Sequence, residues 1–200
     1  MALGRPRLPA GPASGRRRTL LTTATVVAVL LAGALAVTLV TQGSGNASQS
    51  MIEYPAGHRP LAPDFTATSL TGTPIRFASY RGKTVVLNFW GSWCPPCRDE
   101  APTLEVLSQQ YGSKGVAFLG DNVADSPVNA LAFDRSAGIT YPSVNDPGYT
   151  IVADFSAAVP VSDTPTTVVI DGTGHITGLV LGTVTYQEMT ALLRNSAVAK

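Results

Sequence analysis

Two cysteines separated by two prolines are the residues of this chain best suited to chemistry. Cys94 and Cys97 are the only cysteines among the 200 residues, and thiols at this spacing can close and reopen a small disulfide. They lie where an apolar segment expected to be a strand, residues 84–90, gives way to a helix expected over 95–111. Unpaired N–H groups at a helix start favour an anion, so we expect Cys94 to carry the thiolate and to lie nearest the solvent. The pattern indicates thiol–disulfide exchange.

The second cysteine has the complementary task. Cys97 should lie one turn into the helix, where it can attack a mixed disulfide formed on Cys94 and release the reduced partner. Pro95 and Pro96 fit the first helical turn, where a missing N–H costs little, and they stiffen the loop between the sulfurs. The spacing therefore predicts a nucleophile followed by a resolving thiol.

Two other interpretations of the cysteine pair are a structural disulfide and half of a zinc site. Zinc normally takes four ligands. Besides the cysteines, the chain offers only His58 and His175, and neither has ligand spacing. We therefore expect no metal.

Glu100 is a third group that could take part in this chemistry. It follows Cys97 by three residues and precedes Leu104 by four, so it shares the apolar stripe of the expected helix. A carboxyl group that faces apolar surroundings has a raised pKa and could exchange protons with Cys97. The alternative is an acid that only complements the helix dipole. Asn88, on the preceding strand, cannot titrate, so Glu100 is the leading candidate proton carrier.

The elements that must position these groups follow an α/β pattern. Strands are expected at 65–70, 75–77, 84–90, 116–121, 166–170 and 176–181, and helices at 95–111, 128–137, 149–155 and 186–195. Their order predicts a sandwich with a central mixed sheet flanked by helices and an N-terminal β-hairpin extension. Residues 120–161 contain no motif that indicates a role.

The first 56 residues have the composition of accessory segments. Residues 20–40 hold no charged side chain, and five arginines precede them. As a helix this run spans about 30 Å, the thickness of a bilayer core, and the arginines favour the cytoplasmic side. We expect a cytoplasmic basic tail over 1–18, a single transmembrane helix over 19–41, a flexible linker over 42–56 and a globular domain over 57–200.

A cleaved signal peptide, which usually has a shorter apolar core, and a loose twin-arginine signal are the alternatives for the apolar run. Each of these versions places the cysteine pair outside the cytoplasm, where a disulfide can persist. Apart from the five N-terminal arginines, the chain has nine Lys and Arg against thirteen Asp and Glu, about −4. A nucleic-acid partner is therefore not expected.

Several motifs occur in an order that is more specific than the cysteine spacing alone. They are Asp64-Phe65, Tyr80-Arg81-Gly82-Lys83, residues 87–102 around the cysteines, Thr164-Pro165-Thr166-Thr167, and Ile170-Asp171-Gly172-Thr173-Gly174. With these motifs, the chain resembles the thioredoxin superfamily over about residues 61–185, and more closely the membrane-anchored TlpA/ResA-like thiol–disulfide oxidoreductases of bacteria. The resemblance implies a thioredoxin-like fold and a redox-active Cys94–Cys97 disulfide with no other cofactor.

The resemblance also implies a surface for substrates. Pro165 matches the family proline that faces the cysteine pair and is cis in the family, and the backbone of the residue before it can pair with an incoming strand. The expected substrate-contact residues are Trp93, Pro95, Pro96, Thr164 and Pro165. In the family the protein partner is often an apocytochrome c, whose cysteines must be reduced for cytochrome c maturation, and electrons come from a membrane thiol carrier.

Three other functions are open at this point. The pair could introduce disulfides instead of reducing them, because the direction depends on the reduction potential. The Asp64-Phe65 and Arg81-Gly82-Lys83 pattern also suggests a peroxiredoxin-like peroxidase, although Ser92-Trp93 stands where a Thr-x-x-Cys arrangement would be needed. A thioredoxin-fold binding module without catalysis would use the groove around Pro165.

Overall fold

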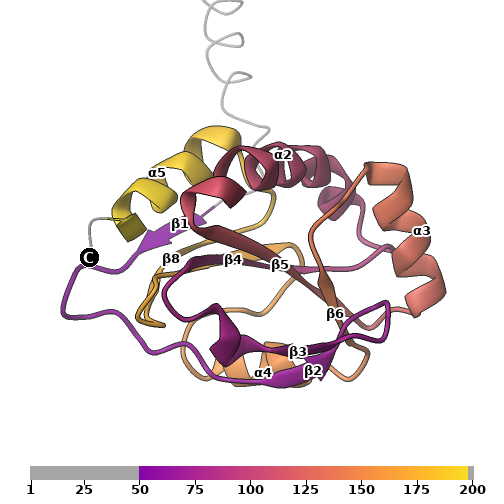
Figure 1. Cartoon of the computed structure of the whole chain (residues 1–200), viewed down its shortest axis with the longest axis horizontal. Helices are drawn as coiled ribbons and strands as arrows, with labels where there is room; N and C mark the ends of the chain where they lie inside the picture. The colour runs from indigo at the N-terminus through magenta and orange to yellow at the C-terminus, as the bar shows by residue number, and fades with distance from the viewer. Residues whose placement is uncertain (1–49, 198–200) are drawn as a thin grey trace, which may run out of the picture. The chain divides into compact units, whose positions relative to one another are not determined.

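The computed structural model describes residues 50–197 (Figure 1). Its strands are β1 (Ser50–Glu53), β2 (Thr66–Thr68), β3 (Pro74–Arg76), β4 (Thr84–Trp90), β5 (Val116–Val123), β6 (Ser143–Asp146), β7 (Thr166–Ile170) and β8 (Ile176–Leu181). Its helices are α2 (Pro95–Tyr111), α3 (Pro127–Ala137), α4 (Thr150–Ser156) and α5 (Tyr186–Ala197), with 3₁₀ turns η1 (Phe77–Tyr80) and η2 (Gly112–Lys114).

The central sheet is mixed, as expected. Its strand order is β1-β8-β7-β4-β5-β6, and β2 with β3 forms a separate two-stranded sheet. Strand β4 runs parallel to β5, and β5 to β6, whereas β4 is antiparallel to β7. Residues 85–90 of β4 are all buried, which is typical of a central strand covered on both faces. The strand that leads to the cysteines is thus enclosed on both faces of the sheet.

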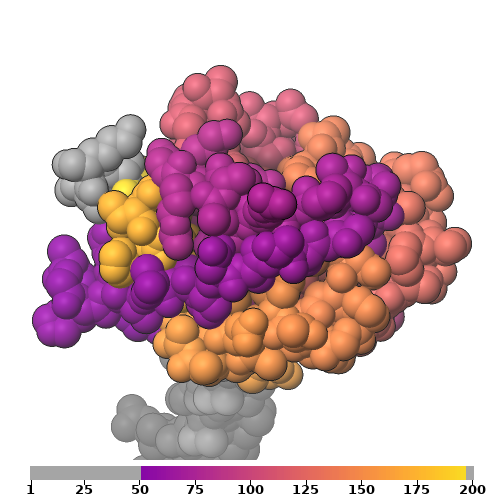
Figure 2. All heavy atoms as spheres, turned by 60° about the horizontal axis from the view of Figure 1, so that its bottom comes forward, coloured from indigo at the N-terminus to yellow at the C-terminus, as the bar shows by residue number. Residues whose placement is uncertain are grey.

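The two faces of the sheet belong to different clusters of side chains. Val85, Leu87 and Phe89 of β4 pack in the cluster that includes Phe155 of α4. Val86, on the opposite face, packs with residues of α2 and α5. Figure 1 shows α2 and α5 over one face and α4 with β2 and β3 over the other, and Figure 2 shows the indigo-to-purple segment of β2 and β3 beside the orange segment of α4. The alternation of β4 therefore directs its even-numbered residues toward α2.

Most expected elements are confirmed. Helix α2 and strands β7 and β8 have the expected bounds, and the β2–β3 hairpin is present. Strand β5 continues two residues further than expected, to Val123, and β6 was not expected at all. Both differences have one cause. Strand β6 and the end of β5 are short and partly polar, so neither has the apolar pattern that predicts a strand, and each is held in place by pairing with the other.

The expected linker is wrong at its C-terminal end. Residues 50–53 form β1, which pairs with the edge of β8 through contacts such as Ile52 with Leu179. The domain thus begins before residue 57, because a strand from far along the chain provides the partner for this short segment. The expected tail over 1–18 and transmembrane helix over 19–41 lie outside the described residues. Within residues 50–197, no helix is long and apolar enough to cross a bilayer.

Candidate functional site

The cysteine pair lies at the junction of β4 and α2, as the sequence predicts. Cys94 is the N-cap of α2, and its Sγ accepts a hydrogen bond of 3.2 Å from the backbone N–H of Cys97. Pro95 and Pro96 carry no N–H, so the N–H of Cys97 is the first one that the helix offers. The two sulfurs are joined in a disulfide with an S–S distance of 2.04 Å. The sulfur of Cys94 thus sits where the N-terminus of a helix would stabilise a negative charge.

The expectation that Cys94 lies nearest the solvent is wrong for this oxidised state. Cys94 and Cys97 are each only 2% exposed. The disulfide holds the Cys94 sulfur against the N–H of Cys97, and both residues pack with Leu70, Trp90, Ala101, Ala130 and Phe133. The neighbours in sequence are open, since Trp93 is 52% exposed and both prolines are exposed. A partner would therefore reach the sulfur just below the surface, past this rim.

Glu100 points into the protein, as its place on the apolar stripe predicts. The residue is 1% exposed. Its Oε1 accepts a hydrogen bond of 2.8 Å from Asn88 Nδ2, and its Oε2 accepts one of 2.9 Å from the backbone N–H of Val184. Burial raises the pKa of Glu100 to about 7, although these two hydrogen bonds favour the charged form. A group with this pKa can hold or release a proton at neutral pH.

Asn88 is the residue that orients this carboxyl group. It lies on the α2 side of β4, opposite Thr167 in the register of β4 and β7. Its Nδ2 donates both to Glu100 Oε1 and, at 2.9 Å, to Thr167 Oγ1. Because an amide can donate to a carboxylate without titrating, Asn88 fixes the position of Glu100 and leaves the proton chemistry to it.

The indole of Trp93 is tied to the end of β5 by one hydrogen bond, although the residue as a whole stays exposed. Its Nε1 donates to the backbone oxygen of Val123 at 3.2 Å. Gly91 makes this possible, because a Cβ at that position would lie 2.5 Å from Trp93 Nε1. Trp93 thus presents one face of a fixed aromatic ring beside the cysteines, which suits the contact role expected for it.

Asp125 is a site residue that the sequence reasoning missed. Its Oδ2 accepts a hydrogen bond of 2.7 Å from the backbone N–H of Ser92 and one of 3.2 Å from Asn122 Nδ2. Burial alone would raise its pKa, but the hydrogen bonds from Ser92, Asn122 and Ser126 outweigh burial and lower it. The available sequence indication was that β4 and β5 are adjacent and parallel, so their C-terminal ends meet at one edge. Asp125 anchors the loop that leads to Cys94.

Pro165 lies at the same edge of the sheet. The Thr164–Pro165 peptide bond is cis, as the resemblance implies, and Pro165 is buried while Thr164 is half-buried. Phe89 pairs with Thr166, so Pro165 is level with the last residue of β4, from which the cysteine loop continues. The structure thus brings the expected contact residues to one end of β4 and β7.

The part of the chain that the structure describes holds no group of three or more His, Cys, Asp or Glu side chains that could bind a metal ion. His175 Nδ1 lies 2.8 Å from Thr173 Oγ1, in the turn between β7 and β8. The disulfide of Cys94 and Cys97 is a group at this site with the capacity for redox chemistry.

Comparisons with known proteins agree with this geometry. The model of the AhpC/TSA family matches residues 59–178. The thiol-disulfide oxidoreductase ResA of Geobacillus kaustophilus is 37% identical over 128 residues, which cover 64% of this chain and 71% of the relative. Among solved structures, a DsbF homologue from Corynebacterium diphtheriae is 34% identical with a TM-score of 0.67, covering 76% of this chain and 96% of that one.

A second solved structure is a secreted thiol-disulfide isomerase from Corynebacterium glutamicum. It is 31% identical, has a TM-score of 0.69, and covers 77% of this chain and 96% of that one. The match to the family model, the close relatives and the cysteine pair at the start of α2 lead to one assignment. The chain belongs to the AhpC/TSA family with a thioredoxin-like fold, and it is a thiol–disulfide oxidoreductase of the ResA type.

Proposed function

We propose that this oxidoreductase works outside the cytoplasm and reduces disulfides in partner proteins, with Cys94 as the attacking thiol and Cys97 as the resolving thiol. The observation that carries the proposal is the hydrogen bond from the N–H of Cys97 to Cys94 Sγ at the start of α2. A helix N-terminus stabilises a thiolate at Cys94 more than at Cys97, which lies inside the first turn.

The reaction then proceeds in two exchanges. In the first, the Cys94 thiolate attacks one sulfur of the partner disulfide, and the other partner sulfur leaves as a thiolate. In the second, Cys97 loses its proton and attacks Cys94, which forms the intramolecular disulfide and releases the second partner thiolate. The partner gains two electrons and takes up two protons, and the chain is oxidised to the disulfide state of this structure.

Glu100 is the proposed proton carrier for Cys97. It follows Cys97 by one turn of α2, it is buried, and its pKa of about 7 allows it to accept the thiol proton at neutral pH. Asn88 supports this role because its hydrogen bond fixes the carboxyl group from the side of β4.

The proposed contact surface for the partner is made of Trp93, Pro95, Pro96, Thr164 and Pro165. Trp93 and the two prolines are exposed, and Pro165 lies at the same edge of the sheet. An extended segment of the partner could pair with the backbone at Thr164, next to the disulfide.

The proposed location rests on the uncharged run over residues 20–40, which suits a membrane anchor or an export signal. A solved relative whose name includes the word secreted agrees with it. The resemblance to ResA-like proteins supports apocytochrome c as the partner, in cytochrome c maturation, and a membrane thiol carrier as the electron donor.

A trapping experiment tests the proposed function. The full-length chain with Cys97→Ala keeps the attacking sulfur and lacks the resolving one, so it should accumulate a partner as a mixed disulfide that mass spectrometry can identify. The matched control, Cys94→Ala, has the same number of thiols and should trap nothing. Equal trapping by both variants, or trapping by the control alone, would contradict the assignment of roles. An apocytochrome c among the trapped proteins would identify the substrate.

A further inference from the structure

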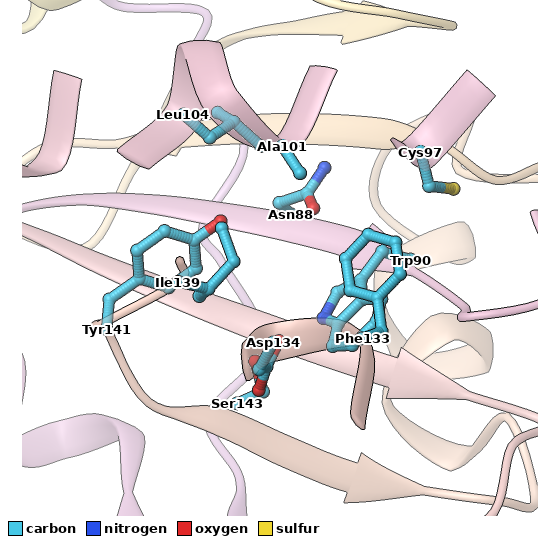
Figure 3. A pocket seen from close by; sticks show the side chains of 10 residues that line it. All are labelled: Asn88, Trp90, Cys97, Ala101, Leu104, Phe133, Asp134, Ile139, Tyr141 and Ser143. Carbon is cyan, nitrogen blue, oxygen red and sulfur yellow. The ribbon is translucent and has the colours of Figure 1, made fainter. Parts of the chain in front are cut away.

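A small cavity lies beside Cys97, on the side of the sheet covered by α2 and α3. Its volume is about 10 Å³, and its wall includes Asn88, Trp90, Cys97, Asp134, Tyr141 and Ser143. Figure 3 shows Cys97 at one end of the cavity and Asp134 with Ser143 at the other. This volume is about that needed by one water molecule.

A glycine in the sheet allows two of the lining side chains to approach the backbone closely. Asn88, Gly120 and Ser143 lie in one row across β4, β5 and β6, so they share a face. A Cβ at Gly120 would collide with Ser143 Oγ and would lie 2.6 Å from Trp90 Nε1. The missing side chain therefore lets Ser143 Oγ and Trp90 Nε1 come close to Gly120, and both residues line the cavity.

Two of the bordering oxygens have unused hydrogen-bonding capacity. Asp134 Oδ1 and Ser143 Oγ are buried and have no hydrogen-bond partner among the described residues. Buried polar atoms are normally satisfied, and a water in a polar cavity typically makes two to four such bonds. The size of the cavity and these two oxygens thus fit one bound water in a space that Cys97 also lines.

Asp134 also borders a second, larger hollow. A surface groove of about 380 Å³ is lined by Asp134, Tyr141 and Ser143, which also line the inner cavity, and by exposed residues that include Thr71 and Arg135. The carboxyl group of Asp134 therefore lies in the wall between the space beside Cys97 and the outer solvent. The groove shares no lining residue with the proposed contact surface for the partner.

We propose that Asp134 relays the proton of Cys97 between the inner cavity and the solvent of the outer groove, through one bound water. The proposal rests on the proposed function, because it concerns the resolving step of the same site. During that step the partner is attached to Cys94 and covers the front of the site. A route at the back lets the proton leave while the partner is still bound.

The electrostatics of Asp134 suit a relay. Burial raises its pKa to about 7, so this carboxyl group can take up and release a proton at neutral pH. Among the described residues the salt bridge that the structure contains joins Arg59 and Asp171, so none fixes the charge of Asp134. The titratable and charged groups around Asp134 are Tyr141, Arg135 in the groove, and Arg98 over the ring of Phe133. The pKa of Tyr141 is raised chiefly by burial, and further by the charges of Glu100, Asp134 and Glu105.

The relay balances with the chemistry of the resolving step. Besides direct transfer to Glu100, the cavity gives the Cys97 proton a second exit: the thiol gives its proton to the cavity water as that water passes a proton to the Asp134 carboxylate. Cys97 sulfur then bonds to Cys94 sulfur, and the partner sulfur leaves as a thiolate. Asp134 finally releases its proton into the groove, and the same path serves in reverse when the disulfide is reduced again.

A two-phase experiment on the full-length chain tests the relay. The reduced chain is mixed with a symmetrical aromatic disulfide whose thiolate is coloured, from about pH 5 to about pH 9. The first burst of colour reports attack by Cys94, and the second reports attack by Cys97. With Asp134→Asn the second phase should slow by about tenfold near pH 7 and approach the rate of the unmodified chain near pH 9, where hydroxide removes the proton. The first phase should keep its rate.

The matched control is Asp154→Asn, the same chemical change at an exposed position of α4. It should leave both phases unchanged. A second phase of Asp134→Asn with the pH profile of the unmodified chain, or one slowed equally at every pH, would overturn the relay. Absence of the first phase in the unmodified chain would overturn the proposed function instead, so the two failures are distinguishable.

If Asp134→Asn does not fold, the unmodified chain still gives an answer. With aspartate labelled at the carboxyl carbon, nuclear magnetic resonance follows the titration of Asp134 in the oxidised and reduced states. The relay predicts a titration that shifts between the states, because reduction places a titrating thiol at the other end of the cavity. Identical titrations in the two states would overturn it.

Discussion

Replacing Glu100 with glutamine should make the free energy of unfolding depend less on pH. In the folded chain the pKa of Glu100 is raised from 4.5 to about 7, chiefly by burial. At about 1.4 kcal/mol per pKa unit, ionising this group costs roughly 3 kcal/mol more in the folded than in the unfolded chain. Because the folded pKa is the higher one, the contribution of Glu100 to stability is fully present below about pH 4 and is lost as pH rises from there to about pH 7.

Glutamine removes this titration but also removes one hydrogen bond of the buried side chain. Asn88 Nδ2 and the N–H of Val184 both donate to Glu100 in the folded chain. Glutamine has one acceptor oxygen and one donor group, so one of these donors loses its partner, at a cost of about 1–3 kcal/mol. This loss is the same at every pH. Glu100→Gln should therefore be less stable than the unmodified chain near pH 4 and close to it, or more stable, near pH 8.

Urea denaturation of the oxidised full-length chain measures this directly, with Asp99→Asn as a control at an exposed position of the same helix. The difference in free energy of unfolding between Glu100→Gln and the unmodified chain should change by roughly 3 kcal/mol between about pH 4 and about pH 8. A difference that is constant over this range would refute the reasoning, because it would mean that Glu100 titrates alike in the folded and unfolded chain.

Three further predictions concern other parts of the site and the core. Asp121→Asn should stabilise the chain by on the order of 1–3 kcal/mol near pH 8 in thermal or urea unfolding, and an unchanged stability would contradict this. The reason is that Asp121 is 0% exposed, both its oxygens lack hydrogen-bond partners among the described residues, and burial raises its pKa. Pro96→Ala adds an N–H near Cys94 and should raise the reduction potential by about 10–30 mV, measured against glutathione, whereas an unchanged or lower potential would argue against thiolate stabilisation by the helix. Asp125→Asn should lower stability by about 1–2 kcal/mol above pH 4 and slow attack by Cys94, because the charged acceptor of the Ser92 N–H is lost; equal rates would show that the anchor is not needed.

The parts of the structure that follow from local pattern were predictable. Helix α2 has the expected bounds because Pro95 begins it and an apolar stripe runs to Tyr111. The inward direction of Glu100 follows from the same stripe. The order of the elements likewise predicted the mixed sheet and the position of Cys94 at the helix start.

The features that depend on contacts between distant segments were not predictable. Strand β1 exists because Ile52 meets Leu179, more than a hundred residues away, and nothing in its own sequence distinguishes it from a linker. The hydrogen bond between Asn88 and Glu100 requires the register of β4 under α2. The burial of Cys94 depends on the closed disulfide and on side chains from α3, which no spacing in the sequence indicates.

The alkylation of the reduced full-length chain tests the central assignment most directly. Iodoacetamide reacts with thiolates, so mass spectrometry of the modified peptides over a range of pH reports the ionisation of Cys94 and of Cys97 separately. If the start of α2 stabilises a thiolate, Cys94 reacts first, and its rate at neutral pH is already close to the maximum while Cys97 is protected. Equal rates for the two cysteines, or a Cys94 that reacts only as pH approaches about 8.5 like a free thiol, would contradict the account.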